Sequence, residues 1–135
     1  MFTNMNSLFI LLAMIFLHIY DDFVSQPVIL NKLKQQSWWK QNLNEKMFQK
    51  YQYDYIAGLI IHAISWAFMM MLPIALKMSF NVPPLFGVLF IANVVIHASI
   101  DHSKANKGQI TLIEDQIFHL FQIIITFILM LHYIL

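Results

Sequence analysis

Four stretches of the chain are apolar enough and long enough to cross a membrane as helices. They cover residues 7–26, 55–76, 84–104 and 112–135. A helix needs about 20 mostly apolar residues for this, because the hydrocarbon core is about 30 Å thick and each residue advances about 1.5 Å. Pro83 and Pro84 suit a helix start before the third stretch, and Thr111 with Glu114 forms a capping-box pattern before the fourth. The pattern predicts an all-α polytopic membrane protein, a single domain over 1–135 built as an antiparallel bundle of four transmembrane helices.

The only long polar stretch, residues 29–54, lies between the first two predicted helices. It contains the pair Trp38 and Trp39 together with several tyrosines. Amphipathic aromatic rings settle at the lipid headgroups, so we expect an amphipathic segment that lies at the membrane interface. Contact of the tryptophan pair with a substrate is the alternative role.

The lysines predict which loops face the cytoplasm, because short cytoplasmic loops are rich in positive charge. Lys77 falls in the second loop, and the other seven of the eight basic residues fall in the first or third: Lys32, Lys34, Lys40, Lys46, Lys50, Lys104 and Lys107. Loops 29–54 and 104–111 are therefore expected in the cytoplasm, with both chain ends outside. The membrane would be a bacterial inner membrane or the cytoplasmic membrane of a host.

The composition agrees with a lipid environment and excludes several function classes. The chain is 59% hydrophobic and only 11% charged, with a net charge of +1. It carries no basic stripe interleaved with aromatic residues, so a nucleic-acid partner is not expected. It has no cysteine, which rules out disulfides and thiolate metal ligands. Any metal would be held by nitrogen and oxygen atoms.

Histidine and aspartate recur in pairs that lie four residues apart and therefore share one helix face. The three pairs are His18 with Asp22, His97 with Asp101, and Asp115 with His119. His62 lies about two turns into the second predicted helix, and all these residues fall at the cytoplasmic ends of their helices. An antiparallel bundle would bring them together. Ionisable groups inside a membrane span are costly, so each one is a candidate for function.

Neutral imidazole and carboxylate are the usual ligands of zinc, manganese and iron. We expect one or two divalent transition-metal ions, zinc before manganese or iron, on seven candidate ligands: His18, Asp22, His62, His97, Asp101, Asp115 and His119. Two ions would use this number of ligands more completely than one tetrahedral ion. In a catalytic site Asp101 and Asp115 would bridge the ions or act as general base, while Lys104 and Gln26 would contact the substrate oxygen.

Simpler interpretations stay open beside the metal site. The cluster would also suit a relay for protons, or a polar core that pins the helices together. His62, taken alone, is as consistent with core packing as with coordination. Asp21 is expected to cap the polar stripe or to face water, His102 to lie beside the site without taking part, and His132 to face headgroups at the far end of the fourth helix.

Four motifs resemble a known family. The pattern His18-x-x-x-Asp22-Phe23-x-x-Gln26, the single His62, His97-x-x-x-Asp101-x-x-Lys104 and Asp115-Gln116-x-x-His119 occur in order over nearly the whole chain, with Lys32 after the first block. This arrangement resembles the bacterial and phage membrane-protein family called domain of unknown function 3307. The resemblance suggests similarity to small membrane-embedded, metal-dependent hydrolases. The acidic doublet at Asp21 and Asp22 and the lysine-rich first loop depart from the family pattern.

The hypothesis favoured by the sequence is a membrane-embedded metal-dependent hydrolase. Its substrate would be a phosphoester or another lipid-linked or amphiphilic molecule at the cytoplasmic face. A metal-ion or proton transporter is the first alternative, although the outer halves of the predicted helices are almost wholly apolar and a transporter needs polar groups at the midplane. A non-enzymatic small phage-type membrane protein is the second. Pairing into a homodimer would cover part of the apolar surface.

Overall fold

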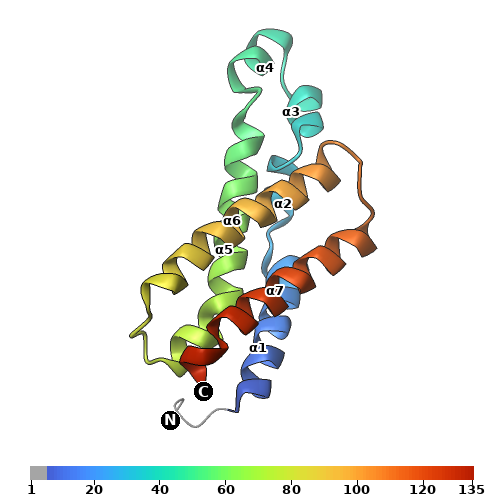
Figure 1. Cartoon of the computed structure of the whole chain (residues 1–135). Helices are drawn as coiled ribbons and strands as arrows, with labels where there is room; N and C mark the ends of the chain where they lie inside the picture. Colours follow the sequence, from blue (N-terminus) through green and yellow to red (C-terminus); the bar gives the residue numbers. More distant parts are fainter. Residues whose placement is uncertain (1–5) are drawn as a thin grey trace.

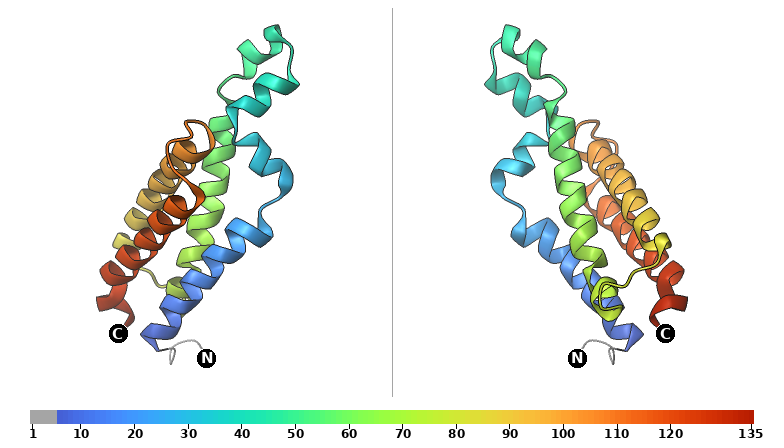
Figure 2. Two further views of the ribbon diagram at one scale, coloured as in Figure 1. Left: turned by 90° about the vertical axis from the view of Figure 1, so that its right-hand side faces the viewer. Right: turned by 90° about the vertical axis from the view of Figure 1, so that its left-hand side faces the viewer.

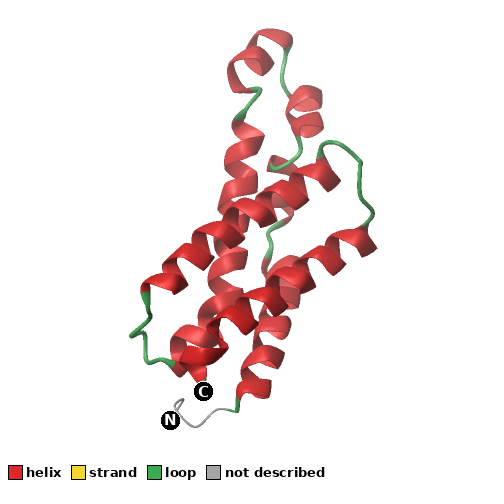
Figure 3. Ribbon diagram, in the orientation of Figure 1, coloured by secondary structure: helices red, strands yellow, loops and turns green. Residues whose placement is uncertain are grey.

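The computed structural model describes residues 6–135, and within that range it is helical with no strand (Figure 3). The helices are α1 (Ser7–Tyr20), the π-helix η2 (Asp21–Ser25), α2 (Val28–Leu33), α3 (Gln36–Asn42), α4 (Glu45–Tyr51), α5 (Asp54–Lys77), α6 (Pro84–Ala105) and α7 (Leu112–Ile134). Four helical segments are long and apolar enough to cross a membrane: Ser7–Ser25, which joins α1 to η2, and the helices α5, α6 and α7.

Local sequence signals set the ends of these helices. The Asn6 side chain accepts a hydrogen bond from the Leu8 amide at the start of α1. Thr111 and Glu114 form the expected reciprocal capping box at the start of α7, and α6 begins at Pro84, where a missing N–H costs nothing. The first and last residues of the four long helical segments lie close to those of the four predicted stretches. The prediction of four apolar helices is therefore confirmed.

Each of the four long helices packs against at least two of the others. Helix α5 packs against α1 and α6, and α7 packs against α6 and α1. In Figure 1 the chain rises along α1, descends along α5, rises along α6 and descends along α7. Figure 2 shows α6 and α7 on one side and α5 with α1 on the other, so that polar faces from all four helices can meet between the pairs.

The apolar core fills one end of the bundle. Its buried members come from the first half of α1, the second half of α5, the start of α6 and the second half of α7: Ile10, Met14, Trp66, Ala67, Met70, Met71, Ile74, Leu89, Ile123, Met130 and Ile134. Large apolar side chains also cover the outside, among them Phe16, Ile91 and Ile125, each more than half exposed. Such an outer surface is typical of helices that face lipid.

The polar segment between η2 and α5 folds into three short helices. The end of α2 packs closely on α5, because a Cβ at Gly58 would lie only 3.0 Å from the backbone of Leu33 and Lys34. The Trp39 indole donates a hydrogen bond to the Leu33 carbonyl at 2.8 Å, and Trp38 packs edge-on against Trp39. The Asn106 side chain, just past α6, bonds to the Lys34 carbonyl and the Gln36 amide. These contacts fix the turn that carries Lys34.

Candidate metal centre

The π-helical turn at the end of α1 brings two consecutive aspartates into the interior. Asp21 is 3% exposed, and its Oδ1 accepts hydrogen bonds from Ser65 Oγ at 2.8 Å and Ser25 Oγ at 3.2 Å. The expectation that Asp21 faces water is wrong, because η2 is wider than an α-helical turn and lets both neighbours point inward. Turns of this kind occur often at functional sites.

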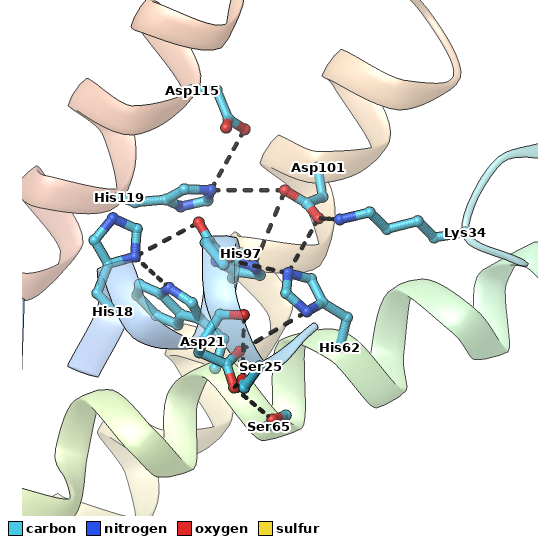
Figure 4. A network of polar contacts seen from close by, with 12 residues as sticks. His18, Asp21, Ser25, Lys34, His62, Ser65, His97, Asp101, Asp115 and His119 are labelled. Carbon is cyan, nitrogen blue, oxygen red and sulfur yellow. Dashed lines mark hydrogen bonds and ion pairs between the residues drawn. The ribbon is translucent and has the colours of Figure 1, made fainter. Parts of the chain in front are cut away.

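His62 of α5 links the aspartates of the first and third spans. Its Nε2 lies 3.3 Å from Asp22 Oδ1 and 3.5 Å from Asp101 Oδ2. Its Nδ1 lies 3.9 Å from Asp21 Oδ2. Figure 4 shows the ring between Asp21 and Asp101. His62 is therefore part of the polar cluster rather than of the apolar core.

The tautomer of His119 follows from its hydrogen-bond partners. Gln122 Nε2 donates to the carbonyl oxygen and to Oδ1 of Asn93, both at 3.2 Å. This orientation leaves Gln122 Oε1, an acceptor, 3.1 Å from His119 Nδ1. His119 Nδ1 must then carry the proton. In the neutral ring, the lone pair of Nε2 points to the other side.

On that side His119 Nε2 faces the oxygen atoms of two carboxylates, which are acceptors. His119 Nε2 lies 3.4 Å from Asp115 Oδ1 and 3.6 Å from Asp101 Oδ1. Both Asp115 and His119 are completely buried, and neither Asp115 Oδ1 nor His119 Nε2 has a hydrogen-bond partner among the described residues. Buried acceptors that converge without a donor are costly unless a cation or an added proton lies between them. The arrangement suits a metal ion, with Gln122 orienting the ligand as outer partners of metal-bound histidines do.

His97 lies at the centre of the cluster. Its ring stacks on both Trp66 and His119, with centroids 4.3 Å and 4.1 Å away. It is completely buried, and neither ring nitrogen has a hydrogen-bond partner among the described residues. An imidazole held rigidly with two unpaired nitrogens is available for coordination through either of them.

Two overlapping groups of side chains have the spacing of metal ligands. One contains Asp22, His62 and His97, and the other contains His97, Asp101 and His119. In each group the candidate ligand atoms lie within 4.8 Å of one another. His97 belongs to both, so the two groups form one continuous cluster between the helix pairs (Figure 4).

His18 lies at the edge of this cluster with both ring nitrogens already engaged. The Trp66 indole donates to its Nδ1 at 2.7 Å, and since an indole N–H can only donate, Nδ1 is the acceptor. Its Nε2 then donates to Gln116 Oε1 at 3.1 Å. Asp22 lies 3.6 Å from Nδ1. Coordination by His18 would require it to exchange one of these hydrogen bonds for the metal.

Two lysines contact the carboxylates of the cluster. Lys34 Nζ lies 2.7 Å from Asp101 Oδ2, and Lys104 Nζ pairs with Asp115 Oδ2 and lies 4.0 Å from Asp101 Oδ1. With four aspartates, two lysines and neutral imidazoles, the cluster carries a formal charge of −2. One divalent cation would neutralise it.

The structure thus brings all seven predicted ligands and Lys104 into one cluster. Gln26, predicted to contact substrate, lies at the end of η2 with a buried Nε2 that has no partner among the described residues. Sequence reasoning missed Lys34 and Trp66, whose roles depend on contacts between distant segments. Gln116 forms hydrogen bonds with His18, Asp22 and Asp115. Its position next to Asp115 in the sequence was the only local sign that it belongs to the cluster. His102 and the exposed His132 lie outside the cluster.

Comparisons with family models, curated proteins and solved structures find no match to this chain. The resemblance to the family called domain of unknown function 3307 therefore stays a prediction that depends on the four motifs.

Proposed function

We propose that the protein is a membrane-embedded, metal-dependent hydrolase. Its four long helices cross the bilayer as an antiparallel bundle, and the segment α2–α4 lies at the headgroups of the cytoplasmic face. The alternating direction of the four helices supports the first statement. The concentration of lysines in the connecting segments supports the second. The substrate is a phosphoester or another lipid-linked or amphiphilic molecule.

The observation that carries the proposal is the convergence of acceptors on His119. The Oδ1 atoms of Asp101 and Asp115 lie 3.6 Å and 3.4 Å from its Nε2. Neither Nε2 nor Asp115 Oδ1 has a hydrogen-bond partner among the described residues. Lys34 and Lys104 offset only half of the aspartate charge. A divalent transition metal, with zinc as the first candidate, removes both problems together. Its ligands are nitrogen and oxygen atoms of the kind that zinc prefers.

A second ion is the extension that fits the remaining residues. Asp101 presents Oδ1 to His119 and Oδ2 to His62, at 3.6 Å and 3.5 Å. Asp101 would therefore be the residue that holds both ions, with His119 on one side and His62 and Asp22 on the other, and Lys34 would share Oδ2 with the second ion. Two-metal sites with bridging carboxylates are common in enzymes that hydrolyse phosphoesters.

When bound, the metal would polarise a phosphoryl or carbonyl oxygen and activate a water molecule. The chain's own residues supply the rest of the site. Lys34 and Lys104 offset half of the aspartate charge, so two divalent ions would leave the cluster with a net positive charge, which favours an anionic group as substrate. The buried rings of Trp66, His97 and His119 pack against one another beside the carboxylates. The apolar core closes the opposite end of the bundle.

The test is the metal content of the purified protein together with its hydrolytic activity. We expect stoichiometric transition metal in the parent. The affinity for the metal should fall at least tenfold in His119→Ala and in Asp101→Asn. It should not change in His132→Ala, which replaces the exposed histidine at the other end of α7. The activity of purified protein towards phosphoester amphiphiles should depend on the same residues. A metal-free parent that cannot be loaded would overturn the metal site, and a loaded but inactive protein would overturn the hydrolase.

Transport of a metal ion or of protons is the second candidate, for one specific reason. Polar contacts continue from His119 through Gln122 and Asn93 to Thr126, whose Oγ1 lies 2.8 Å from Asn93 Nδ2. This chain leads toward the middle of α6 and α7. Flux of zinc or protons into vesicles that contain the protein, lost in Asn93→Leu, would favour transport over hydrolysis.

A further inference from the structure

A groove between α5 and α6 lies outside the metal cluster. This open groove has a volume of about 360 Å³, which is at the small end of the range for ligand sites. The first turns of α5 form one wall and the last turns of α6 form the other. The residues on both walls follow helical spacing, so each helix presents one face to the groove.

The groove changes from polar to apolar along its length. His102, Ser103 and Lys107 line it where α6 ends, and Ile56, Leu59, Ile60 and Ala98 line its other part. No acidic side chain lines it, and Lys107 is its only charged residue. The His102 ring stacks on Tyr55 with centroids 5.8 Å apart. Within the described residues neither His102 nor Lys107 forms a salt bridge, so both are available to an anionic ligand.

The direction of this change matches the order of groups in a membrane lipid. Lys107 and Tyr55 lie at the helix ends, where lipid headgroups would lie if α5 and α6 cross a bilayer. Ile60 and Ala98 lie about one to two turns deeper, at the level of the first acyl carbons. Ile56 and Ile60 are each more than 40% exposed, so they offer apolar surface to a chain.

We propose that the α5–α6 groove binds the headgroup and the upper acyl chain of an anionic phospholipid. The phosphate lies beside Lys107 and His102, and the chain lies against Ile56, Ile60 and Ala98. This site is separate from the hydrolase proposal and requires only that α5 and α6 cross the membrane. The lipid selects this face because the lysine attracts the anionic headgroup and the aliphatic residues retain the chain.

Native mass spectrometry of the purified full chain tests the proposal. The protein is offered equal amounts of phosphatidylglycerol and phosphatidylcholine with the same acyl chains. We expect the parent to retain more phosphatidylglycerol than phosphatidylcholine. Lys107→Gln should lower the retention of phosphatidylglycerol about fivefold, which is the size expected for one lysine near a headgroup. Ala98→Leu fills the groove and should weaken the retention of both lipids. Lys46→Gln, at an exposed lysine of α4 outside the groove, should behave as the parent.

Three results would overturn the site. These are equal retention of the two lipids by the parent, unchanged retention in Lys107→Gln, and full displacement of the lipid by inorganic phosphate alone, which would make the groove a site for free phosphate. The zinc content of Lys107→Gln and Ala98→Leu should equal that of the parent. This measurement separates failure of the lipid site from failure of the metal site.

Discussion

Lys34 Nζ and Asp101 Oδ2 form a buried ion pair at 2.7 Å between segments 67 residues apart in the chain. Lys34 is held by its backbone contacts to Gly58 and Asn106. Because Lys34 occupies Oδ2, it leaves Asp101 Oδ1 directed at His119. The connecting segment between the first two spans thus supplies a residue that orients a carboxylate of the candidate metal centre.

Removal of Lys34 should destabilise the protein strongly. Lys34→Gln leaves Asp101 buried without its closest cation, and breaking one partner of a buried pair typically costs about 3–5 kcal/mol. Thermal unfolding in detergent measures the loss, and Lys32→Gln, at an exposed position of α2, is the control. The double variant Lys34→Gln/Asp101→Asn should recover part of the lost stability, because it no longer buries an unpaired carboxylate. Additive losses would show that the two residues are not coupled.

The two glycines of the long helices should respond in opposite ways to alanine. At Gly58 the added methyl lies 3.0 Å from the Leu33 and Lys34 backbone, so α2 must shift, at a cost of about 1–3 kcal/mol. At Gly87 nothing lies within 4 Å of the added methyl. Alanine there should be neutral or stabilise α6 by up to about 1 kcal/mol. Equal effects of Gly58→Ala and Gly87→Ala on the melting temperature would contradict the close packing of α2 on α5.

Gln122 should affect metal affinity without being a ligand. Its Oε1 accepts a hydrogen bond from His119 Nδ1 and so orients Nε2 toward Asp101 and Asp115. Loss of such outer partners typically lowers metal affinity by about 10–100-fold. We expect this loss for Gln122→Leu in a zinc competition titration with a chromogenic chelator. Gln109→Leu, at an exposed position before α7, should titrate as the parent does.

Zinc should raise the thermal stability of the protein. A ligand that binds only the folded state stabilises it by about 2.7 kcal/mol at a concentration 100 times its dissociation constant. The shift in melting temperature should vanish in Asp101→Asn, and Mg²⁺ should produce none, because it prefers an all-oxygen octahedral site. A shift that persists in Asp101→Asn would place the binding elsewhere in the chain.

Trp66 should hold His18 in one tautomer. Its indole donates to His18 Nδ1 while its ring stacks on His97. Trp66→Phe keeps an aromatic ring and removes the donor, which should cost about 1–3 kcal/mol. The ¹⁵N shifts of His18 should then show a mixture of tautomers. Trp38→Phe, in the segment between η2 and α5, should leave these shifts unchanged.

The sequence by itself determined the four apolar helices and the set of residues that gather between them. Helix lengths follow from the extent of apolar residues, and the four-residue spacing of His97 with Asp101 and of Asp115 with His119 places each pair on one face regardless of tertiary context. The capping signals at Thr111 and Pro84 were also local. These features depend only on neighbours in the chain.

Tertiary structure alone decided how those residues are used. Three contacts join segments far apart in sequence: the hydrogen bond from Ser65 to the buried Asp21, the ion pair of Lys34 with Asp101, and the hydrogen bond from Trp66 to His18. No local pattern specifies them, because each depends on which helix faces lie against one another. The tautomer of His119 likewise follows from Gln122 and Asn93 of two different helices. Spacing along the chain predicts which residues share a face, whereas only packing between helices decides which atoms remain unpaired.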